Sequence, residues 1–235
     1  MSQLVQTMGA LISAGDARCA HQIAWVQADT LIARDLAWMN RGQHWLQTVR
    51  SSPFSDMQPG IVVLGLGPHC APQLGFEDAI SYYVGAMEQI VKDISQLRME
   101  RPDIHIVWKT ITPGHPSKLA GVPDSPLQNS SYFADGSLGW RFNHRFFPAM
   151  DAIALTALKD TSVAIMDASP LYLRADGHPR IHKDKSGMHP FYKNMTDILH
   201  YCANGPLDFL AESLFNTMQH LPPPPPPSPP APGAT

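Results

Sequence analysis

The sequence contains 235 residues, of which 44% are hydrophobic and 16% are charged, enough for one domain with a full hydrophobic core. The net charge of −3 argues against a broadly basic face, so we predict that the protein binds neither nucleic acid nor an anionic membrane surface. No apolar run reaches the roughly 18 residues of a membrane helix, so we expect no membrane span in this chain.

Strand and helix patterns alternate along the chain. The strand patterns are short apolar or β-branched runs, and the helix patterns repeat apolar residues at helical spacing. In chain order they predict a strand over 10–14, a helix over 19–38, a strand over 61–64, a helix over 77–99, a strand over 103–110, a helix over 150–158, a strand over 162–166 and a helix over 208–218. This alternation predicts an α/β fold, a three-layer α/β/α sandwich whose mostly parallel sheet is covered on both faces.

The helix over 77–99 shows the clearest apolar face. The residues expected to be buried there are Ile80, Val84, Met87, Ile90, Val91, Ile94 and Leu97. In parallel sheets, active sites gather at the carboxyl ends of the strands. Those ends are predicted at 15–16, 65–67, 110–115 and 167.

The last fifteen residues are dominated by proline, which lacks a backbone donor and favours the extended polyproline II conformation. We therefore predict one folded domain over residues 1–220 and a disordered proline-rich tail over 221–235. Such a tail is of the kind that SH3- or WW-like domains bind, so a partner of the tail is one open interpretation.

Asp197 and His200 form the strongest local pattern for chemistry. An acid three positions before a histidine can accept from one ring N–H and fix the tautomer, which leaves the other ring nitrogen free as a general base. The spacing alone is common, and a surface Asp near an unrelated His also fits it.

Two further segments accompany this pair in a fixed order. Residues 109–115 read Lys-Thr-Ile-Thr-Pro-Gly-His at the end of a predicted strand, residues 176–179 read Asp-Gly-His-Pro, and Asp197-x-x-His200 is followed by Tyr-Cys and Gly-Pro-Leu-Asp. Over residues 61–218 this order resembles the PC-esterase group of the SGNH/GDSL superfamily, which includes the plant trichome-birefringence-like proteins. That group shows R-T-x-S-P-x-H, D-G-H-P, and D-x-x-H-W-C with G-P-x-D after it.

The resemblance implies an SGNH-hydrolase-like fold without a cofactor or a metal. It also implies O-acyl transfer or ester hydrolysis on carbohydrate O-acetyl groups, with a carbohydrate or an acyl donor as the substrate. His200 would be the general base and Asp197 its orienting partner. The plant relatives work in the Golgi, which implies the secretory pathway, whereas residues 1–16 lack the pattern of a signal peptide; the localisation stays open.

The nucleophile motif departs from the family. Gly15, Asp16 and Ala17 occupy the positions of its Gly-Asp-Ser, and an alanine methyl group cannot attack a carbonyl. Three interpretations stay open: the chain is a catalytically inactive relative, the true motif lies upstream of this sequence, or Ser13 or Cys19 replaces the serine.

The oxyanion block departs in the same direction, because glycine replaces an asparagine side-chain donor at Gly65. The backbone N–H groups of Gly65 or Gly67 are the oxyanion-hole candidates, although a tight turn explains both glycines equally well. The candidates for lining the substrate cleft are His69, Lys109, Thr110 and His115. Cys202 stands where family members have a disulfide cysteine, and Cys70 is its conceivable partner.

Histidines gather in the last third of the chain, but their spacing matches no common metal-ligand pattern. We expect solvated loop histidines at positions 178, 182, 189 and 200 and no metal site. Two functions therefore compete, an O-acyltransferase or esterase and a catalytically inactive carbohydrate-binding or interaction module.

Overall fold

The computed structural model describes residues 31, 44–52, 54–57, 60–67, 75–116, 123, 125–138, 141–178, 201 and 205–222. Their centre is a three-stranded sheet in the order β1-β2-β3, made of β1 (Ile61–Leu64), β2 (His105–Lys109) and β3 (Ala164–Met166). Both strand pairs are parallel, and Val107 lies beside Val63 on one side and beside Ala164 on the other. The strands predicted over 61–64, 103–110 and 162–166 are confirmed, the last two in shortened form.

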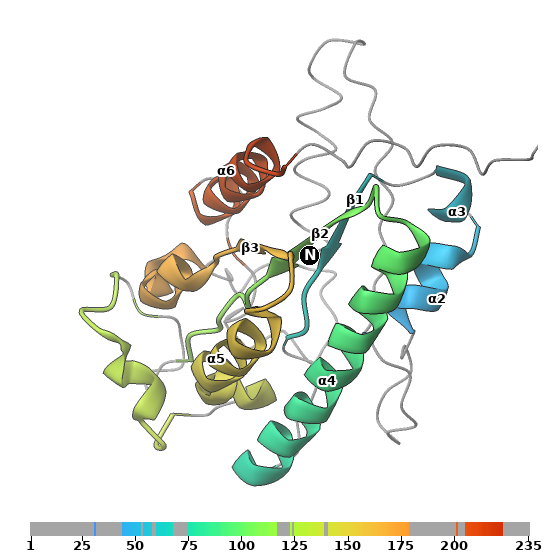
Figure 1. Ribbon diagram of the computed structural model, residues 1–235. Coiled ribbons are helices and arrows are strands. Elements are labelled where there is room, and N and C mark those ends of the chain that lie inside the picture. Colours follow the sequence, from blue (N-terminus) through green and yellow to red (C-terminus); the bar gives the residue numbers. More distant parts are fainter. Residues whose placement is uncertain are drawn as a thin grey trace, which may run out of the picture.

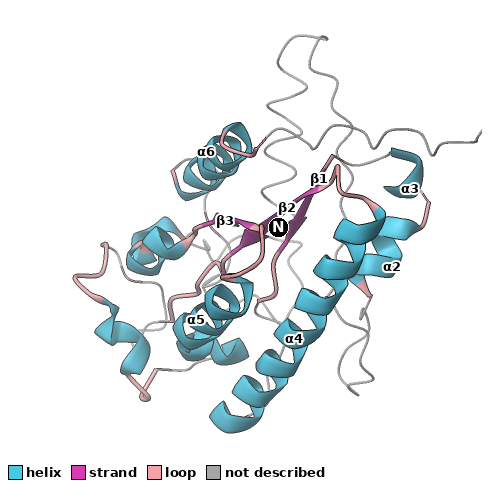
Figure 2. Cartoon of the chain, viewed as in Figure 1, coloured by secondary structure: helices cyan, strands magenta, loops and turns pink. Residues whose placement is uncertain are grey.

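Helices surround the sheet (Figures 1 and 2). In chain order they are α2 (Trp45–Arg50), α3 (Phe54–Met57), α4 (Phe76–Glu100), α5 (Phe147–Leu158) and α6 (Pro206–Gln219). Short 3-10 turns join them, namely η2 (Ser130–Ala134), η3 (Arg141–Phe146), η4 (Ser169–Leu173) and η5 (Ala175–Gly177). The helices predicted over 77–99, 150–158 and 208–218 are confirmed as α4, α5 and α6, with ends that differ by a few residues.

The side chains of β2 alternate between two cores, as the period of a strand requires. Ile106 and Trp108 join the core under α2, α4 and α5. Val107 points to the other face and joins the core under α6. Figure 1 shows α4 and α5 on one side of the sheet and α6 on the other. The sheet is thus covered on both faces, as a three-layer sandwich requires.

The buried face of α4 differs from the prediction. Val84 is 38% exposed, whereas Tyr82 and Tyr83 are buried. The two tyrosines offer more apolar surface than valine. The buried face of the helix is therefore centred about one position away from the predicted face. The other predicted positions of this face are buried or half-buried.

The start of α6 explains the Gly-Pro-Leu-Asp segment in structural terms. Gly205 has a φ of 104°, a backbone conformation that only glycine adopts easily. Pro206 is the first helical residue, where its missing N–H costs nothing. The Gly205 N–H donates to Asp208 Oδ2 at 2.9 Å, so the carboxylate satisfies a donor ahead of the first turn.

The elements predicted over 10–14 and 19–38 lie outside the described residues, apart from Leu31. The boundary predicted between residues 220 and 221 stays a prediction. No helix within the described ranges combines the length and the apolar character that crossing a bilayer demands.

Candidate functional site

The carboxyl ends of β2 and β3 are tied together by Thr110. Its N–H donates to Met166 O at 3.1 Å, and its Oγ1 accepts from Ala168 N–H at 2.7 Å. Thr110 Oγ1 also lies 3.5 Å from Asp167 Oδ1, and Asp167 in turn accepts from the backbone N–H and the hydroxyl of Ser169, each at 2.8 Å. The ends of these two strands therefore form one hydrogen-bonded unit.

A buried ammonium and a buried carboxylate lie below this edge. Lys109 Nζ donates to Thr112 Oγ1 at 2.6 Å and to Thr110 O at 3.0 Å. Burial lowers the pKa of Lys109 to about 8, and the charge of Asp151 partly opposes that change. Each charge thus favours the ionised form of the other group, although the contacts described include no direct ion pair between them.

Asp151, on α5, fixes the loop after β2. Its Oδ1 accepts from Ile111 N–H at 2.9 Å, and its Oδ2 accepts from the Tyr172 hydroxyl at 2.8 Å. Burial raises the pKa of Asp151 to about 6, although these two hydrogen bonds and Lys109 favour the charged form. This carboxylate joins α5, the loop after β2 and η4.

A histidine pair lies at the far end of the same loop. His115 and His178 are fully buried, and His115 Nδ1 lies 2.8 Å from His178 Nε2. His115 Nε2 faces the carbonyl oxygen of Tyr172 at 2.9 Å. Burial lowers the pKa of His115 to about 4, so this imidazole is neutral at pH 7.

Tyr201 packs against this pair from the segment that leads into α6. Its ring stacks on His178 with the centroids 4.2 Å apart and an interplanar angle of 31°. Its hydroxyl lies 3.1 Å from Pro113 O, 3.3 Å from Leu171 O and 3.4 Å from His115 Nδ1, so three acceptors surround one proton. Burial raises the pKa of Tyr201 above its usual range, which keeps the hydroxyl protonated.

Gly177 closes the cluster because no side chain fits at that position. A Cβ there would lie 2.5 Å from Pro206 Cγ and 2.9 Å from Tyr201 Cδ1. The preceding residue, Asp176, accepts from Arg174 Nε at 2.9 Å, and this hydrogen bond lowers the pKa of Asp176. Asp176, Gly177 and His178 thus contact Arg174, Tyr201 and His115, respectively.

A comparison with protein families identifies the domain. The PC-Esterase family, described as the GDSL/SGNH-like acyl-esterase family found in Pmr5 and Cas1p, matches residues 16–217. The chain belongs to this family. A comparison with curated proteins gave no match.

Family membership supports the α/β SGNH-like fold and an acyl-esterase or acyltransferase-like function. Within this PC-esterase domain, the structure brings together the two segments that the sequence singled out, residues 109–115 and 176–178. It adds Asp151, Tyr172 and Tyr201, which sequence reasoning missed. Asp151 is the one charged residue of a mainly apolar helix, and that signal was available in the sequence.

Three of the four cleft candidates of the PC-esterase domain lie within the described residues, and all three are interior. Lys109, Thr110 and His115 are 7%, 1% and 0% exposed, which favours a role in holding the loop over direct contact with a substrate. The expectation that His178 is solvated is wrong, because its ring is enclosed by His115, Tyr201 and η5. The oxyanion candidates Gly65 and Gly67 follow β1 and are half-buried; their role stays a prediction.

Several predicted site positions of the PC-esterase domain lie outside the described residues. They are Ser13, Gly15, Asp16, Ala17, Cys19, His69, Cys70, His182, His189, Asp197, His200 and Cys202. Among the positions that the structure does describe, no three His, Cys, Asp or Glu side chains are grouped as metal ligands.

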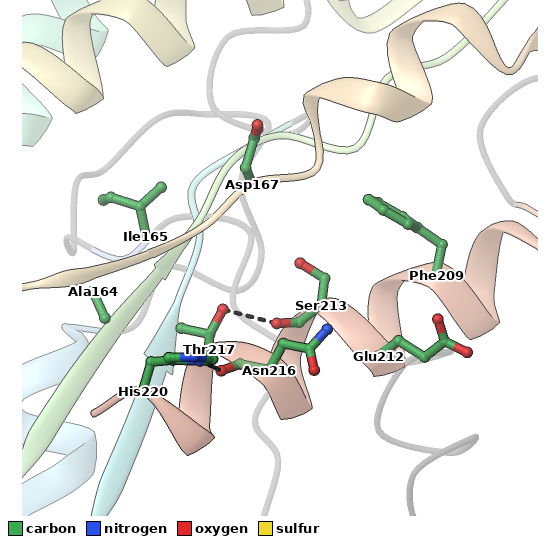
Figure 3. Close-up of a pocket in the computed structure, with 9 residues that line it drawn as sticks. All are labelled: Ala164, Ile165, Asp167, Phe209, Glu212, Ser213, Asn216, Thr217 and His220. Carbon is green, nitrogen blue, oxygen red and sulfur yellow. Dashed lines mark hydrogen bonds between the residues drawn. The ribbon is translucent and has the colours of Figure 1, made fainter. Parts of the chain in front are cut away.

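A groove of about 510 Å³ runs between β3 and α6 (Figure 3). Asp167 and Phe209 lie toward one end of it, and Ala164 and His220 toward the other. The groove therefore starts at the carboxyl end of β3, beside the tied strand ends, and runs along α6 from Phe209 to His220.

Proposed function

We propose that this PC-esterase domain hydrolyses or transfers O-acetyl groups of carbohydrates, with His200 as general base and Asp197 as its orienting partner. The observation that carries the proposal is the anchoring of Tyr201, which directly follows His200 in the sequence. Its hydroxyl contacts Pro113 in the loop after β2 and Leu171 in η4. Tyr201 is thus fixed at the edge of the sheet where the strands end, and active sites of parallel sheets gather there.

The chemistry follows from the residue types. An imidazole held by a carboxylate takes a proton from an attacking O–H group, and backbone N–H groups stabilise the negative charge on the acyl oxygen. Gly65 and Gly67 are the proposed donors. With Ala17 at the nucleophile position, a covalent acyl-enzyme cannot form there. The attacking group in this proposal is water or a sugar hydroxyl, whose proton passes to His200 as the new C–O bond forms and returns to the departing alkoxide when the ester bond breaks.

The alternative function is a catalytically inactive carbohydrate-binding or interaction module. Ala17 is the observation that favours it, because the family serine is replaced by a residue that cannot act as a nucleophile. Retention of both Asp197 and His200 favours the enzyme.

Hydrolysis assays separate the two functions. Rates are measured with p-nitrophenyl acetate and with acetylated xylan for the unchanged chain, His200→Ala, Ala17→Ser and, as control, His105→Ala. His105 lies at the amino-terminal end of β2, away from the strand ends that carry the site. We expect His200→Ala to abolish hydrolysis, Ala17→Ser to raise it in a His200-dependent way, and His105→Ala to leave it unchanged.

Hydrolysis that persists in His200→Ala contradicts the assigned base. Binding of acetylated xylan without any His200-dependent hydrolysis, in the unchanged chain and in Ala17→Ser, establishes the alternative. If only p-nitrophenyl acetate is hydrolysed, the acyl-ester chemistry stands and the carbohydrate substrate is wrong.

A further inference from the structure

The hydrogen bonds of the buried histidine pair define which nitrogens carry protons. The carbonyl oxygen of Tyr172 can only accept, so the His115 Nε2 that faces it at 2.9 Å carries a proton. A neutral imidazole has one ring proton, which leaves His115 Nδ1 as an acceptor. The 2.8 Å contact between the rings therefore runs from the Nε2–H of His178 to Nδ1 of His115.

This direction matters because His178 also supports Tyr201. The same ring that donates to His115 stacks on the phenol ring at 4.2 Å. The phenol ring also lies close to Gly177, where an added Cβ would come within 2.9 Å of Tyr201 Cδ1. The hydroxyl contacts two backbone carbonyls and lies 3.4 Å from His115 Nδ1. Tyr201 is thereby restrained at its ring and at its hydroxyl, and the hydrogen bond to His115 contributes to the orientation of His178.

We infer that His115 and His178, in this defined tautomer, are positioning residues for the residue next to Tyr201, the proposed base His200. This inference rests on the proposed function for the role of His200, and on contacts among described residues for the restraint of Tyr201. His115 fixes His178, His178 and Gly177 fix Tyr201, and Tyr201 is covalently bonded to His200. Neither buried ring needs to touch the substrate for its loss to displace the base.

Two substitutions of His178 separate hydrogen bonding from volume. His178→Leu retains a bulky side chain but removes the donor to His115. His178→Gln places an amide N–H near the position of Nε2 and restores the donor. His105→Leu, at the opposite end of β2, is the matched control, and thermal unfolding shows that each variant is folded before it is compared.

The kinetic test uses p-nitrophenyl acetate. A misplacement of a catalytic group by about 1 Å costs on the order of 100-fold in rate. We expect His178→Leu to lower kcat about 10- to 100-fold with little change in KM, His178→Gln to recover most of that loss, and His105→Leu to have no effect. A folded His178→Leu variant with unchanged kcat overturns the inference.

A second test needs no turnover. NMR spectra of the chain labelled at histidine report the ring nitrogens of His115, His178 and His200. We expect His115 to carry its proton on Nε2 only, and the ring signals of His200 to shift in His178→Leu and to return in His178→Gln. A proton on His115 Nδ1, or His200 signals that ignore both substitutions, overturns the inference even if the chain hydrolyses nothing.

The two proposals fail separately. If His200→Ala keeps its activity while the His200 signals still respond to His178→Leu, the assigned base is wrong and the positioning stands. If His200→Ala is inactive while His178→Leu changes neither kcat nor the His200 signals, the base stands and the positioning is wrong.

Discussion

Replacing Gly177 by alanine tests the packing around Tyr201 with a single carbon atom. The added Cβ would lie 2.5 Å from Pro206 Cγ and 2.9 Å from Tyr201 Cδ1, whereas carbon atoms in contact normally lie about 3.5–4.0 Å apart. Both neighbours are rings held in place, one at the start of α6 and one stacked on His178. The clash therefore has to be relieved by a shift of the backbone or of the phenol ring.

Overpacking of this kind costs about 1–3 kcal/mol of the free energy of unfolding. For a domain of this size each kcal/mol lowers Tm by roughly 2–4 °C, so Gly177→Ala should lower Tm by roughly 2–12 °C. Differential scanning calorimetry measures this change. Gly60→Ala is the matched control, because nothing lies within 4 Å of a Cβ at that exposed position, and its expected effect is within about 0.5 kcal/mol.

Equal Tm values for Gly177→Ala and Gly60→Ala would refute the close contact between Gly177, Tyr201 and α6. Near-ultraviolet circular dichroism adds a second readout, because a displaced Tyr201 loses its fixed environment. A lowered Tm together with an unchanged tyrosine spectrum would mean that the strain is taken up by α6 and not by Tyr201.

Three further predictions concern the buried groups and the core. Tyr172→Phe removes the donor to Asp151 Oδ2 and should lower the free energy of unfolding by about 1.5–3 kcal/mol. Urea unfolding measures this change in a double-mutant cycle with Asp151→Asn, and the absence of a coupling energy between the two substitutions would contradict this hydrogen bond. Because the folded-state pKa of Asp151 is raised from 3.8 to about 6, the folded chain binds more protons there than the unfolded chain, and this group lowers stability by about 3 kcal/mol as the pH rises through that window. The pKa of His115 is lowered from 6.5 to about 4, so its contribution rises with pH over nearly the same window. As the pH is raised from 4 to 6, the free energy of unfolding of Asp151→Asn should therefore increase relative to that of the unchanged chain, as measured by urea titrations. Parallel plots of this free energy against pH for the two proteins would contradict the raised pKa of Asp151. Leu210→Ala, in the core under α6, should cost about 2–5 kcal/mol, whereas Phe215→Ala, 57% exposed on the same helix, should change the urea midpoint little; similar midpoints would mean that α6 does not pack as described.

The sequence predicts the three described strands well because their signal is local. The run Ile61–Leu64 is β-branched and ends at glycine, and the strand has the predicted bounds. The buried face of α4 is predicted less well, because the periodicity of its aliphatic residues and methionine does not include Tyr82 and Tyr83, whose rings are largely apolar. Local pattern therefore identifies the element more reliably than it identifies the residues that the element buries.

The candidate site was predictable only in part, since its contacts join distant residues. The two motif segments were found from their order in the chain, but nothing in either segment shows that His115 and His178, 63 positions apart, share a hydrogen bond. Histidine is intermediate between the buried and the exposed residue types, so its surroundings have to be known before its state can be assigned. Asp151 illustrates the same limit, because its partners lie 40 and 21 positions away.

Thr110, at the end of β2, lets the segments after β2 and β3 diverge without leaving a backbone N–H group unsatisfied. A backbone carbonyl would normally accept from the Ala168 N–H, and the Thr110 hydroxyl takes its place. The hydrogen-bond ladder between β2 and β3 is thus extended by one hydrogen bond to a side chain, and the chain after β3 then turns into η4. Valine has the same shape but no oxygen, so at this position it would leave a buried amide without an acceptor at the point where the two chains diverge.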